Sequence, residues 1–239
     1  MPGVRRLGSR YVNWYLVEDG GRITVVDASL PRYWPQLAAA LAAMGRRLED
    51  IAALVLTHAH GDHVGVAEEL HERGVPVLLH SDDEELMRTH KQPKRETSAL
   101  PNLWRPGVWR FFLHFIRNGA LKAPKIHDTT RIADGDELDV PGRPRVVHTP
   151  GHTLGHCAFH FPRHRAAFVG DAMCTWNPLT GRTGPQLMPR AFGYSSGDSA
   201  ASLERIAGLD ADTVLPGHGE PWIDGAAAAA ARARETGPT

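Results

Sequence analysis

Cysteine, net charge and long apolar runs are all scarce in this 239-residue chain. Two cysteines, Cys157 and Cys174, suggest no disulfide framework and favour a reducing, cytoplasmic compartment. The 27 basic residues balance the 27 acidic ones, which predicts neither a nucleic-acid partner nor an anionic membrane partner. An apolar run of about 20 residues and a signal-peptide core are also missing, which argues against a membrane span. These absences predict a soluble protein with a small-molecule partner.

Core-forming residues, by contrast, are plentiful. Hydrophobic residues make up 42% of the chain, which is enough for a sizeable core. We expect one domain over residues 1–239, interrupted by an insertion rich in proline and aromatic residues at about 90–125. Strand-like runs alternate with helical patterns, beginning with a hairpin over 11–27, a helix over 31–44 and a strand over 51–56. The second half is expected to be richer in short strands, one of them over 137–140. This alternation predicts an α/β layered architecture.

The strongest local signal is the run Thr57-His58-Ala59-His60-Gly61-Asp62-His63, which follows the strand over 51–56. It places four potential metal ligands within six residues, on a loop that two regular elements would hold rigid. A helix is expected to begin near Asp62 or His63 and to end at about 73. The alternative is a solvated turn in which Asp62 caps that helix. Clustered imidazole and carboxylate groups favour a divalent transition metal instead.

Three more strands run into glycine-containing turns that carry a potential ligand. These ligands are His152 after 146–149, Asp171 after 168–169, and His218 after 214–215. Glycine beside each ligand allows the backbone to approach a shared centre closely. One histidine in such a turn means little, but three such turns together with the loop at 57–63 favour a joint metal site.

Two further residues are candidates to support the ligands from outside. Asp27 ends a predicted strand, where its carboxylate would orient a histidine or simply be solvated. His156 lies four residues after His152 and would support a ligand, contact substrate or be structural.

The insertion at about 90–125 is punctuated by Pro93, Pro101, Pro106 and Pro124. Apolar residues over 108–116 recur at helical spacing, and a helix of about ten residues is too short to cross a bilayer. Packing onto its own domain, a lid over the metal loop and a homodimer contact all stay open. A wall for a small, partly apolar substrate would be formed by Trp104, Trp109, Phe192 and Tyr194.

Together these motifs resemble the metallo-β-lactamase-fold hydrolases: His-X-His-X-Asp-His at 58–63, Gly-His-Thr at 151–153, Gly-Asp at 170–171 and Pro-Gly-His-Gly at 216–219. The resemblance implies an αββα sandwich of two mixed sheets flanked by helices. It also implies two metals at the sheet edges. By motif position, the first metal would be held by His58, His60 and His152. The second metal would be held by Asp62, His63 and His218, and Asp171 would bridge both.

Departures from subfamily patterns narrow the resemblance to glyoxalase II-like or lactonase-like members without assigning one. The bridging Asp171 argues against an antibiotic-hydrolysing enzyme, and His60 stands where iron redox members carry glutamate. About twenty residues follow His218, which argues against the glutathione thioester of glyoxalase II. Lactonases place a tyrosine at the position of Cys174, so Tyr194 would have to serve from elsewhere.

The implied chemistry is hydrolysis. A hydroxide bridging two divalent ions would attack a small ester, thioester or lactone. Nitrogen and oxygen ligands favour Zn²⁺, with Mn²⁺ or Fe²⁺ as alternatives. Asp62 would orient the hydroxide and shuttle a proton. The alternatives are a phosphodiesterase of the same fold, an iron-dependent redox member and a non-enzymatic binding protein.

Overall fold

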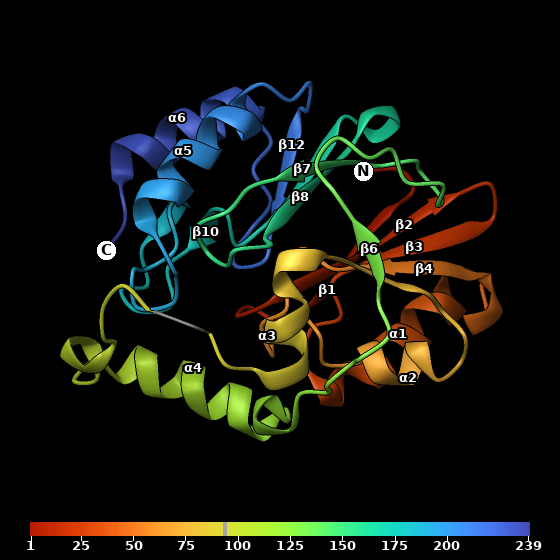
Figure 1. The fold of residues 1–239 in the computed structure, drawn as a ribbon, viewed down its shortest axis with the longest axis horizontal. Coiled ribbons are helices and arrows are strands. Elements are labelled where there is room, and N and C mark those ends of the chain that lie inside the picture. Colours follow the sequence, from red (N-terminus) through yellow and green to blue (C-terminus); the bar gives the residue numbers. More distant parts are fainter. Residues whose placement is uncertain (93–94) are drawn as a thin grey trace.

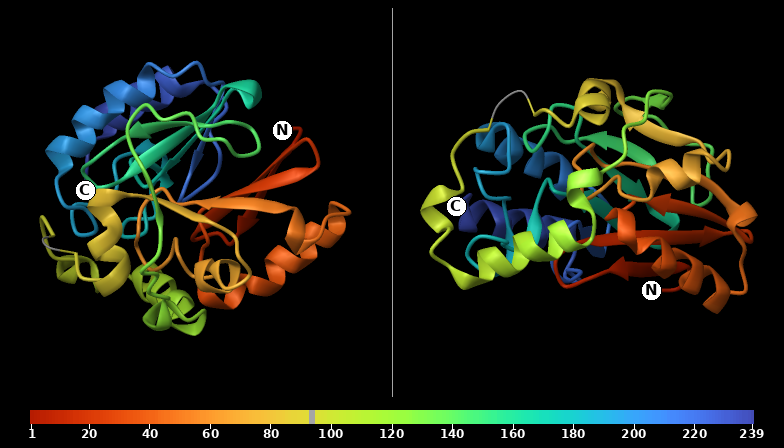
Figure 2. Two further views of the ribbon diagram at one scale, coloured as in Figure 1. Left: turned by 45° about the vertical axis from the view of Figure 1, so that its right-hand side comes forward. Right: turned by 90° about the horizontal axis from the view of Figure 1, so that it is seen from below.

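Two β-sheets face each other at the centre of the molecule, and helices cover their outer faces (Figure 1). The computed structural model describes residues 1–92 and 95–239, so Pro93 of the insertion lies outside the described residues. The four layers are clearest when the molecule is turned: α5 and α6, then one sheet, then the other sheet, then α1 and α2 (Figure 2). This arrangement confirms the expected αββα sandwich.

The first sheet has six strands in chain order. Its first three strands pair antiparallel and the last three add on in parallel, so the sheet is mixed. The strands are β1 (Val4–Gly8), β2 (Asn13–Asp19), β3 (Arg22–Val26), β4 (Ile51–Val55), β5 (Val77–His80) and β6 (Thr130–Ile132).

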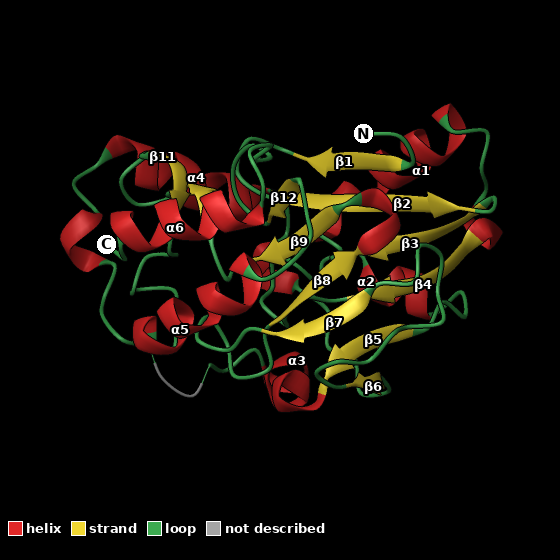
Figure 3. Cartoon of the chain, turned by 90° about the horizontal axis from the view of Figure 1, so that it is seen from above, coloured by secondary structure: helices red, strands yellow, loops and turns green. Residues whose placement is uncertain are grey.

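The second sheet has four strands in the order β12-β9-β8-β7. Its strands β7 to β9 are antiparallel, whereas β12 pairs with β9 in parallel. These strands are β7 (Arg145–His148), β8 (Cys157–Phe161), β9 (Ala166–Gly170) and β12 (Thr213–Pro216). They cross above the first sheet in Figure 3. A separate antiparallel pair is formed by β10 (Cys174–Trp176) and β11 (Thr183–Gln186).

The described residues also form six α-helices, with short 3₁₀ turns between them. The first three lie on the side of the first sheet, α4 lies along one edge of the molecule, and α5 and α6 pack together on the second sheet (Figure 1). They are α1 (Trp34–Ala43), α2 (Ala67–His71), α3 (Glu84–Thr89), α4 (Pro106–Arg117), α5 (Ser196–Ala207) and α6 (Ala226–Thr236).

Alternation along β2 shows how the sequence builds three core layers. Because neighbouring side chains of a strand point to opposite faces, Trp14 and Leu16 pack towards α1 while Tyr15 and Val17 pack between the sheets. The second sheet does the same, with Phe168 facing the first sheet and Val169 facing α5 and α6. Each sheet is therefore buried on one face by the other sheet and on the other face by helices, which fits the apolar sequences of the strands.

The sequence misplaces some element boundaries. The helix expected from Asp62 begins only at Ala67, because the backbone N–H groups of Gly65 and Val66 bond to the carbonyls of Ser29 and Ala28 instead. The strand expected over 137–140 is absent from the described residues: the chain turns back there and makes one isolated bridge. Strands β1, β10 and β11 are not anticipated by the sequence pattern.

The part of the insertion that the structure describes contains α4. Its inner face, led by the buried Val108 and Phe111, packs near Leu179 and Ala191. Within the described part of the chain, no helix is both long enough and apolar enough to cross a bilayer.

Candidate metal centre

All seven predicted ligands follow the carboxyl ends of strands at one edge of the sandwich. The loop after β4 carries His58, His60, Asp62 and His63, and the turns after β7, β9 and β12 carry one ligand each. Because β4 lies in one sheet and the other three strands in the other, the ligands meet across the edge where the sheets face each other.

The structure brings these side chains together in three overlapping groups. Within each group the ligand atoms lie no more than 4.8 Å apart. The groups are His58–His60–His152, His58–His63–Asp171 and Asp62–His63–His218.

Asp171 lies between the first and third groups. Its Oδ2 atom is 3.2 Å from His152 Nε2 and 3.2 Å from His218 Nε2, and its Oδ1 atom is 3.6 Å from His63 Nε2. Asp62 reaches the third group from the other side, with Oδ2 3.5 Å from His218 Nε2. One carboxylate thus contacts histidines of both groups, which is the placement expected of a bridging ligand.

Each of four histidines has its outer ring nitrogen fixed by a partner, which turns the other nitrogen inward. His58 Nδ1 lies 3.0 Å from Thr57 Oγ1, and His63 Nδ1 lies 2.9 Å from Asp27 Oδ2. His60 Nε2 lies 3.1 Å from Gln92 Oε1, and His218 Nδ1 donates to the carbonyl of Tyr11. Such partners set the tautomer and the ring orientation of metal-binding histidines.

The inward atoms fit a cation. His58 Nε2, His63 Nε2 and Asp171 Oδ1 are buried and have no hydrogen-bond partner among the described residues. Burying polar atoms without a partner is costly, so a ligand that binds all three would remove that cost. The donor set is nitrogen and oxygen, as divalent transition metals such as Zn²⁺ prefer.

The surroundings of the ligands favour neutral imidazoles at His58 and His152 and a positive charge at His63. Burial holds the pKa values of His58 and His152 well below the usual histidine range, so both rings are neutral and able to coordinate. Burial also opposes a charge on His63, but Asp171, Asp62 and Asp27 outweigh it and raise the pKa of His63 to about 10. Carboxylates that stabilise a proton here would also stabilise a metal cation.

Both predicted supporting residues contact ligands. Asp27, held at a positive φ of 60°, accepts the Thr57 backbone N–H at 2.8 Å in addition to contacting His63. His156 Nε2 accepts the Asp171 N–H at 3.0 Å, so Nδ1 carries the proton towards Thr149 Oγ1 at 2.8 Å. Burial lowers the pKa of His156 to about 3, which keeps this acceptor neutral.

Sequence reasoning missed Asp83 and Gln92. The buried Asp83 carboxylate accepts bonds from Ala59 N at 3.1 Å, Thr153 Oγ1 at 2.7 Å and Gly155 N at 2.7 Å. It therefore ties the ligand loop of the first sheet to a ligand turn of the second sheet. The sequence pattern places Asp83 in the first turn of a short helix, where nothing local distinguishes it from Asp82.

Glycines make the close approach at the second sheet possible. A Cβ atom on Gly217 would lie 2.4 Å from Asp171 Oδ1 and 2.7 Å from His63 Cε1. Gly170 has a φ of +47°, and a Cβ there would lie 2.5 Å from Thr57 Oγ1. Any side chain at either position would push the ligands apart.

A cavity of about 460 Å³ opens onto the centre. Its wall combines ligands with aromatic and apolar side chains, among them Phe111, Phe112, Phe115, Met188 and Phe192. The ring of Phe111 lies 6.5 Å from that of His218, centre to centre, so α4 stands directly over the ligands.

Of the four residues predicted to contact substrate, the structure brings one to the cavity. Phe192 lines it, whereas Trp104, Trp109 and Tyr194 are not among its lining residues. Trp109 lies on the exposed side of α4, where Val108 and Phe111 take the inward positions, and Trp104 is exposed in the turn before the helix. Tyr194 instead donates its backbone N–H to the carbonyl of Gly151, which holds the turn that carries His152.

Comparison with known proteins places this arrangement in a family. The sequence pattern of the family described as "Metallo-beta-lactamase superfamily" matches residues 7–218. A hydroxyacylglutathione hydrolase of Fuscovulum blasticum is 32% identical over 214 residues, which cover 88% of this chain and 63% of that protein. An uncharacterized protein, YobT of Bacillus subtilis, is 28% identical over 67% of this chain and 61% of its own length. The chain thus spans about six tenths of these curated relatives.

Solved structures agree with the fold. The metallo-beta-lactamase family protein TTHA1429 from Thermus thermophilus superposes with a TM-score of 0.70 at 26% identity, covering 98% of this chain and 79% of the other. TTHA1623 in a di-iron-bound form gives a TM-score of 0.63 at 30% identity and covers 96% of both chains.

Proposed function

The chain belongs to the metallo-beta-lactamase superfamily, and from this membership we propose that it is a metal-dependent hydrolase of a small ester, thioester or lactone. The observation that carries the proposal is the convergence of seven nitrogen and oxygen ligands from four loops, three of whose inward atoms, His58 Nε2, His63 Nε2 and Asp171 Oδ1, have no hydrogen-bond partner among the described residues. A binding protein would not require so complete a ligand set.

The ligand geometry supports two metal positions. His58, His60 and His152 would hold one ion, Asp62, His63 and His218 the other, and Asp171 both. When bound, two divalent cations would lower the pKa of a shared water to about 7 and polarise the substrate oxygen.

The remaining chemical steps would fall to the protein itself. Asp62 is partly open to the cavity and 3.5 Å from His218 Nε2, which suits it to orient the attacking water and to pass on a proton. The aromatic wall would exclude bulk water from the reacting carbonyl. Cys157 and Cys174 are buried and stand outside the ligand groups, so hydrolysis would need no thiol nucleophile.

Substrate size and polarity follow from the cavity. A volume of about 460 Å³ with four phenylalanines in its wall suits a small acyl group with apolar character. The hydroxyacylglutathione hydrolase name of one relative makes thioesters the first class to test. Because the chain spans only part of that relative's length, the glutathione portion itself is not carried over.

Metal identity is a separate proposal. We favour Zn²⁺ because all the ligand atoms are nitrogen or oxygen and none is a thiolate. A di-iron-bound relative makes iron the main alternative, with Mn²⁺ next.

The test measures metal content and turnover on the same preparation. Purified protein should hold about two divalent ions per chain and hydrolyse members of a panel of thioesters, lactones and phosphodiesters. His60→Ala should lose metal and turnover while remaining folded, whereas His127→Ala, an exposed histidine outside the ligand groups, should retain both. Turnover that survives in His60→Ala would refute the site. Activity restricted to phosphodiesters would instead identify a phosphodiesterase, and redox activity with bound iron would identify an iron-dependent redox protein.

A further inference from the structure

The neutral net charge of the chain conceals a strongly basic segment. Residues 91–125 contain eight of the 27 basic residues and one of the 27 acidic residues, a formal charge of +7. The rest of the chain carries the opposite excess. Because an approaching surface responds to local charge, the overall balance says little about this part of the molecule.

Exposed apolar side chains gather in the same segment. Of the nine large hydrophobic residues that are exposed in the described part of the chain, six lie between residues 100 and 121. Trp104 is 75% exposed, Trp109 is 53% exposed and Leu121 is 81% exposed. The other three are Leu100, Leu113 and Ile116. Soluble surfaces seldom concentrate such residues without a partner.

Helix α4 explains why these side chains point outward. Val108, Phe111, Phe112 and Phe115 occupy the inner face, against Leu179 and Phe192 and over the cavity. Trp109, Leu113 and Ile116 recur at i, i+4 and i+7 and so form an adjoining outer stripe. Figure 1 and the left view of Figure 2 place α4 at the lower edge of the molecule, with no other segment below it.

Exposed basic residues lie in the same segment as this stripe. Arg110 and Arg117 lie beside it on α4, and none of the six exposed basic residues forms an ion pair with any described residue. These six are Lys91, Arg95, Arg110, Arg117, Lys122 and Lys125. We call these six residues and the six exposed apolar residues the basic–aromatic surface.

We propose that the basic–aromatic surface docks onto an anionic phospholipid bilayer. A helix that lies in a membrane interface combines an apolar stripe, tryptophan in particular, with flanking lysine and arginine, and this surface has all three. Unpaired positive charge complements anionic headgroups, while the indole rings suit the headgroup region. A second copy of the chain fits less well, because two such surfaces would repel each other. The expectation of no membrane partner rested on net charge, whereas this proposal rests on local charge and exposure.

The basic–aromatic surface adjoins the cavity over the metal centre. Leu121 and Arg95 belong to the basic–aromatic surface and also line the cavity over the metal centre. Docking would bring the cavity opening close to the lipid. The docking proposal itself rests on exposure and charge alone and stands whether or not the protein is a hydrolase.

The test is vesicle flotation with the full chain. Wild-type protein should float with phosphatidylcholine vesicles that contain about one third phosphatidylglycerol and should stay behind with phosphatidylcholine alone. Raising NaCl from about 0.1 M to about 0.5 M should release most of it, because the Debye length shortens.

Two double variants separate the electrostatic and apolar contributions. Arg110→Glu with Arg117→Glu should weaken partitioning at least about twentyfold, since each basic residue near the surface contributes about fivefold. Trp104→Ala with Trp109→Ala should weaken it while leaving the salt dependence in place. Circular dichroism and thermal unfolding of each variant check that the fold is retained.

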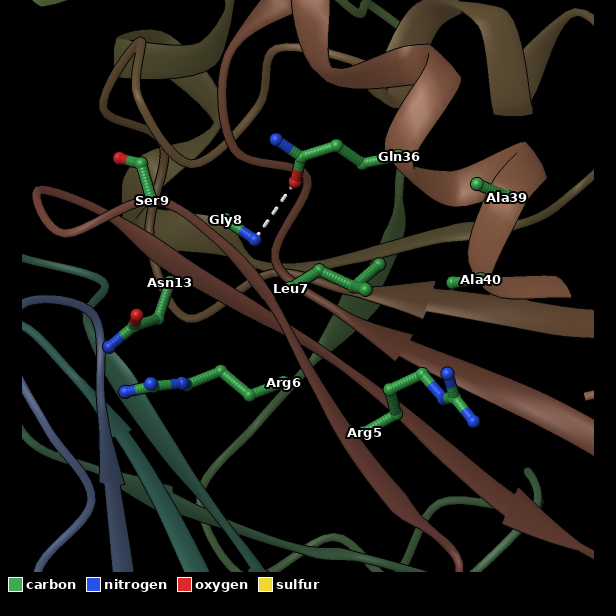
Figure 4. A pocket seen from close by; sticks show the side chains of 9 residues that line it. All are labelled: Arg5, Arg6, Leu7, Gly8, Ser9, Asn13, Gln36, Ala39 and Ala40. Atoms are coloured by element: carbon green, nitrogen blue, oxygen red, sulfur yellow. Dashed lines mark hydrogen bonds between the residues drawn. The ribbon is translucent and has the colours of Figure 1, made fainter. Parts of the chain in front are cut away.

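Matched controls come from another part of the molecule. Arg5→Glu with Arg22→Glu makes the same change in net charge on strands β1 and β3, and Ile223→Ala removes an exposed apolar side chain. Figure 4 shows Arg5 and Arg6 in the pocket between β1 and α1, where Gln36 Oε1 accepts the Gly8 N–H at 3.0 Å. These variants should float like the wild type.

The proposal fails if wild-type protein does not bind the anionic vesicles, or if the control variants lose binding as much as the α4 variants. Sedimentation velocity without vesicles tests the alternative partner, a second copy of the chain. A dimer that Trp104→Ala with Trp109→Ala dissociates, together with no vesicle binding, would assign the surface to a second copy of the chain.

Discussion

The two sheets hold their candidate metal ligands in different ways. The first sheet supplies four ligands from one loop, and buried carboxylates brace that loop: Asp27 binds His63 and Thr57, and Asp83 binds Ala59. The second sheet supplies three ligands from three separate turns, where glycines let the backbone approach closely.

The difference shows two ways of achieving preorganisation. In the first sheet, hydrogen bonds to a carboxylate orient a loop that carries several ligands. In the second sheet, a glycine leaves room for a single ligand at the end of a strand. The first kind should fail gradually when a brace is removed, because other bonds remain. The second kind should fail abruptly, because a methyl group placed 2.4 Å from a ligand oxygen must displace it.

The largest effect is expected from Asp171, whose carboxylate contacts His152 of the first group and His218 of the third group. Asp171→Ala should release both metals and reduce turnover more than about a hundredfold, beyond the loss typical of supporting residues. Metal analysis and single-substrate kinetics check this. Retention of one full equivalent of metal with normal turnover would show that the two groups act independently.

Gly217→Ala tests the second sheet. The added methyl group would push against Asp171 and His63, so we expect a loss of about 1–3 kcal/mol in unfolding free energy and a metal loss approaching that of Asp171→Ala. Urea unfolding and metal analysis measure both. Gly197→Ala is the matched control, because a Cβ there would meet Ser195 Oγ at an ordinary 3.8 Å. Equal behaviour of the two variants would contradict the close-approach argument.

Asp27→Ala tests the first sheet. The variant frees His63 Nδ1 and removes the bond to Thr57 N, so metal affinity should fall about 10- to 100-fold with the fold intact. Competition with a chelator measures the affinity. Asp50→Ala, which removes a carboxylate that bonds to the Arg47 N–H in a turn before β4, serves as the control. If Asp27→Ala had no effect on affinity, the bracing role of the carboxylate would be excluded.

Asp83→Asn probes the link between the two sheets. An amide in place of the carboxylate would direct its NH₂ group at one of three donors, at a cost of about 1–3 kcal/mol in unfolding free energy. Asp83 bonds to the ligand loop and to the turn at Thr153, so its loss should lower metal affinity at both metal positions. The decrease should be smaller than in Asp27→Ala, because Asp83 hydrogen-bonds to no ligand side chain. Calorimetric metal titration should then show two weakened metal sites. If one site kept its affinity, Asp83 would support only the other.

The smallest effect is expected at the stack of His80 on His148, whose rings lie 4.4 Å apart across the two sheets. Burial and the proximity of His148 lower the pKa of His80 below its usual value, while Asp82 acts in the other direction. As pH falls below about 6.5, the unfolded chain therefore takes up the proton first and stability is lost progressively. Unfolding free energies at several pH values should show a shallower acid slope in His80→Gln. An acid slope in His80→Gln equal to that of the wild type would exclude this contribution of His80.

Much of the candidate metal centre could be predicted from the sequence, because potential ligands that follow strand ends leave a local pattern. The loop at 57–63 and the glycine turns around His152, Asp171 and His218 needed no knowledge of distant contacts. The strands were predictable for a similar reason, since alternation along β2 already records the two faces of a sheet. Predictions failed where long-range bonds intervene, as at Gly65 and Val66, which pair with Ser29 and Ala28 instead of starting a helix.

Residue types and their spacing, then, determined the fold class and the chemical nature of the site, because periodicity and ligand identity are properties of the chain alone. Tertiary structure alone decided which carboxylates brace the ligands and which aromatic side chains face the cavity. Asp83 and Asp82 are alike in sequence, as are Phe111 and Trp109, yet one of each pair is buried and the other exposed. The physical reason is that burial depends on what packs against a residue, and those neighbours lie tens of residues away.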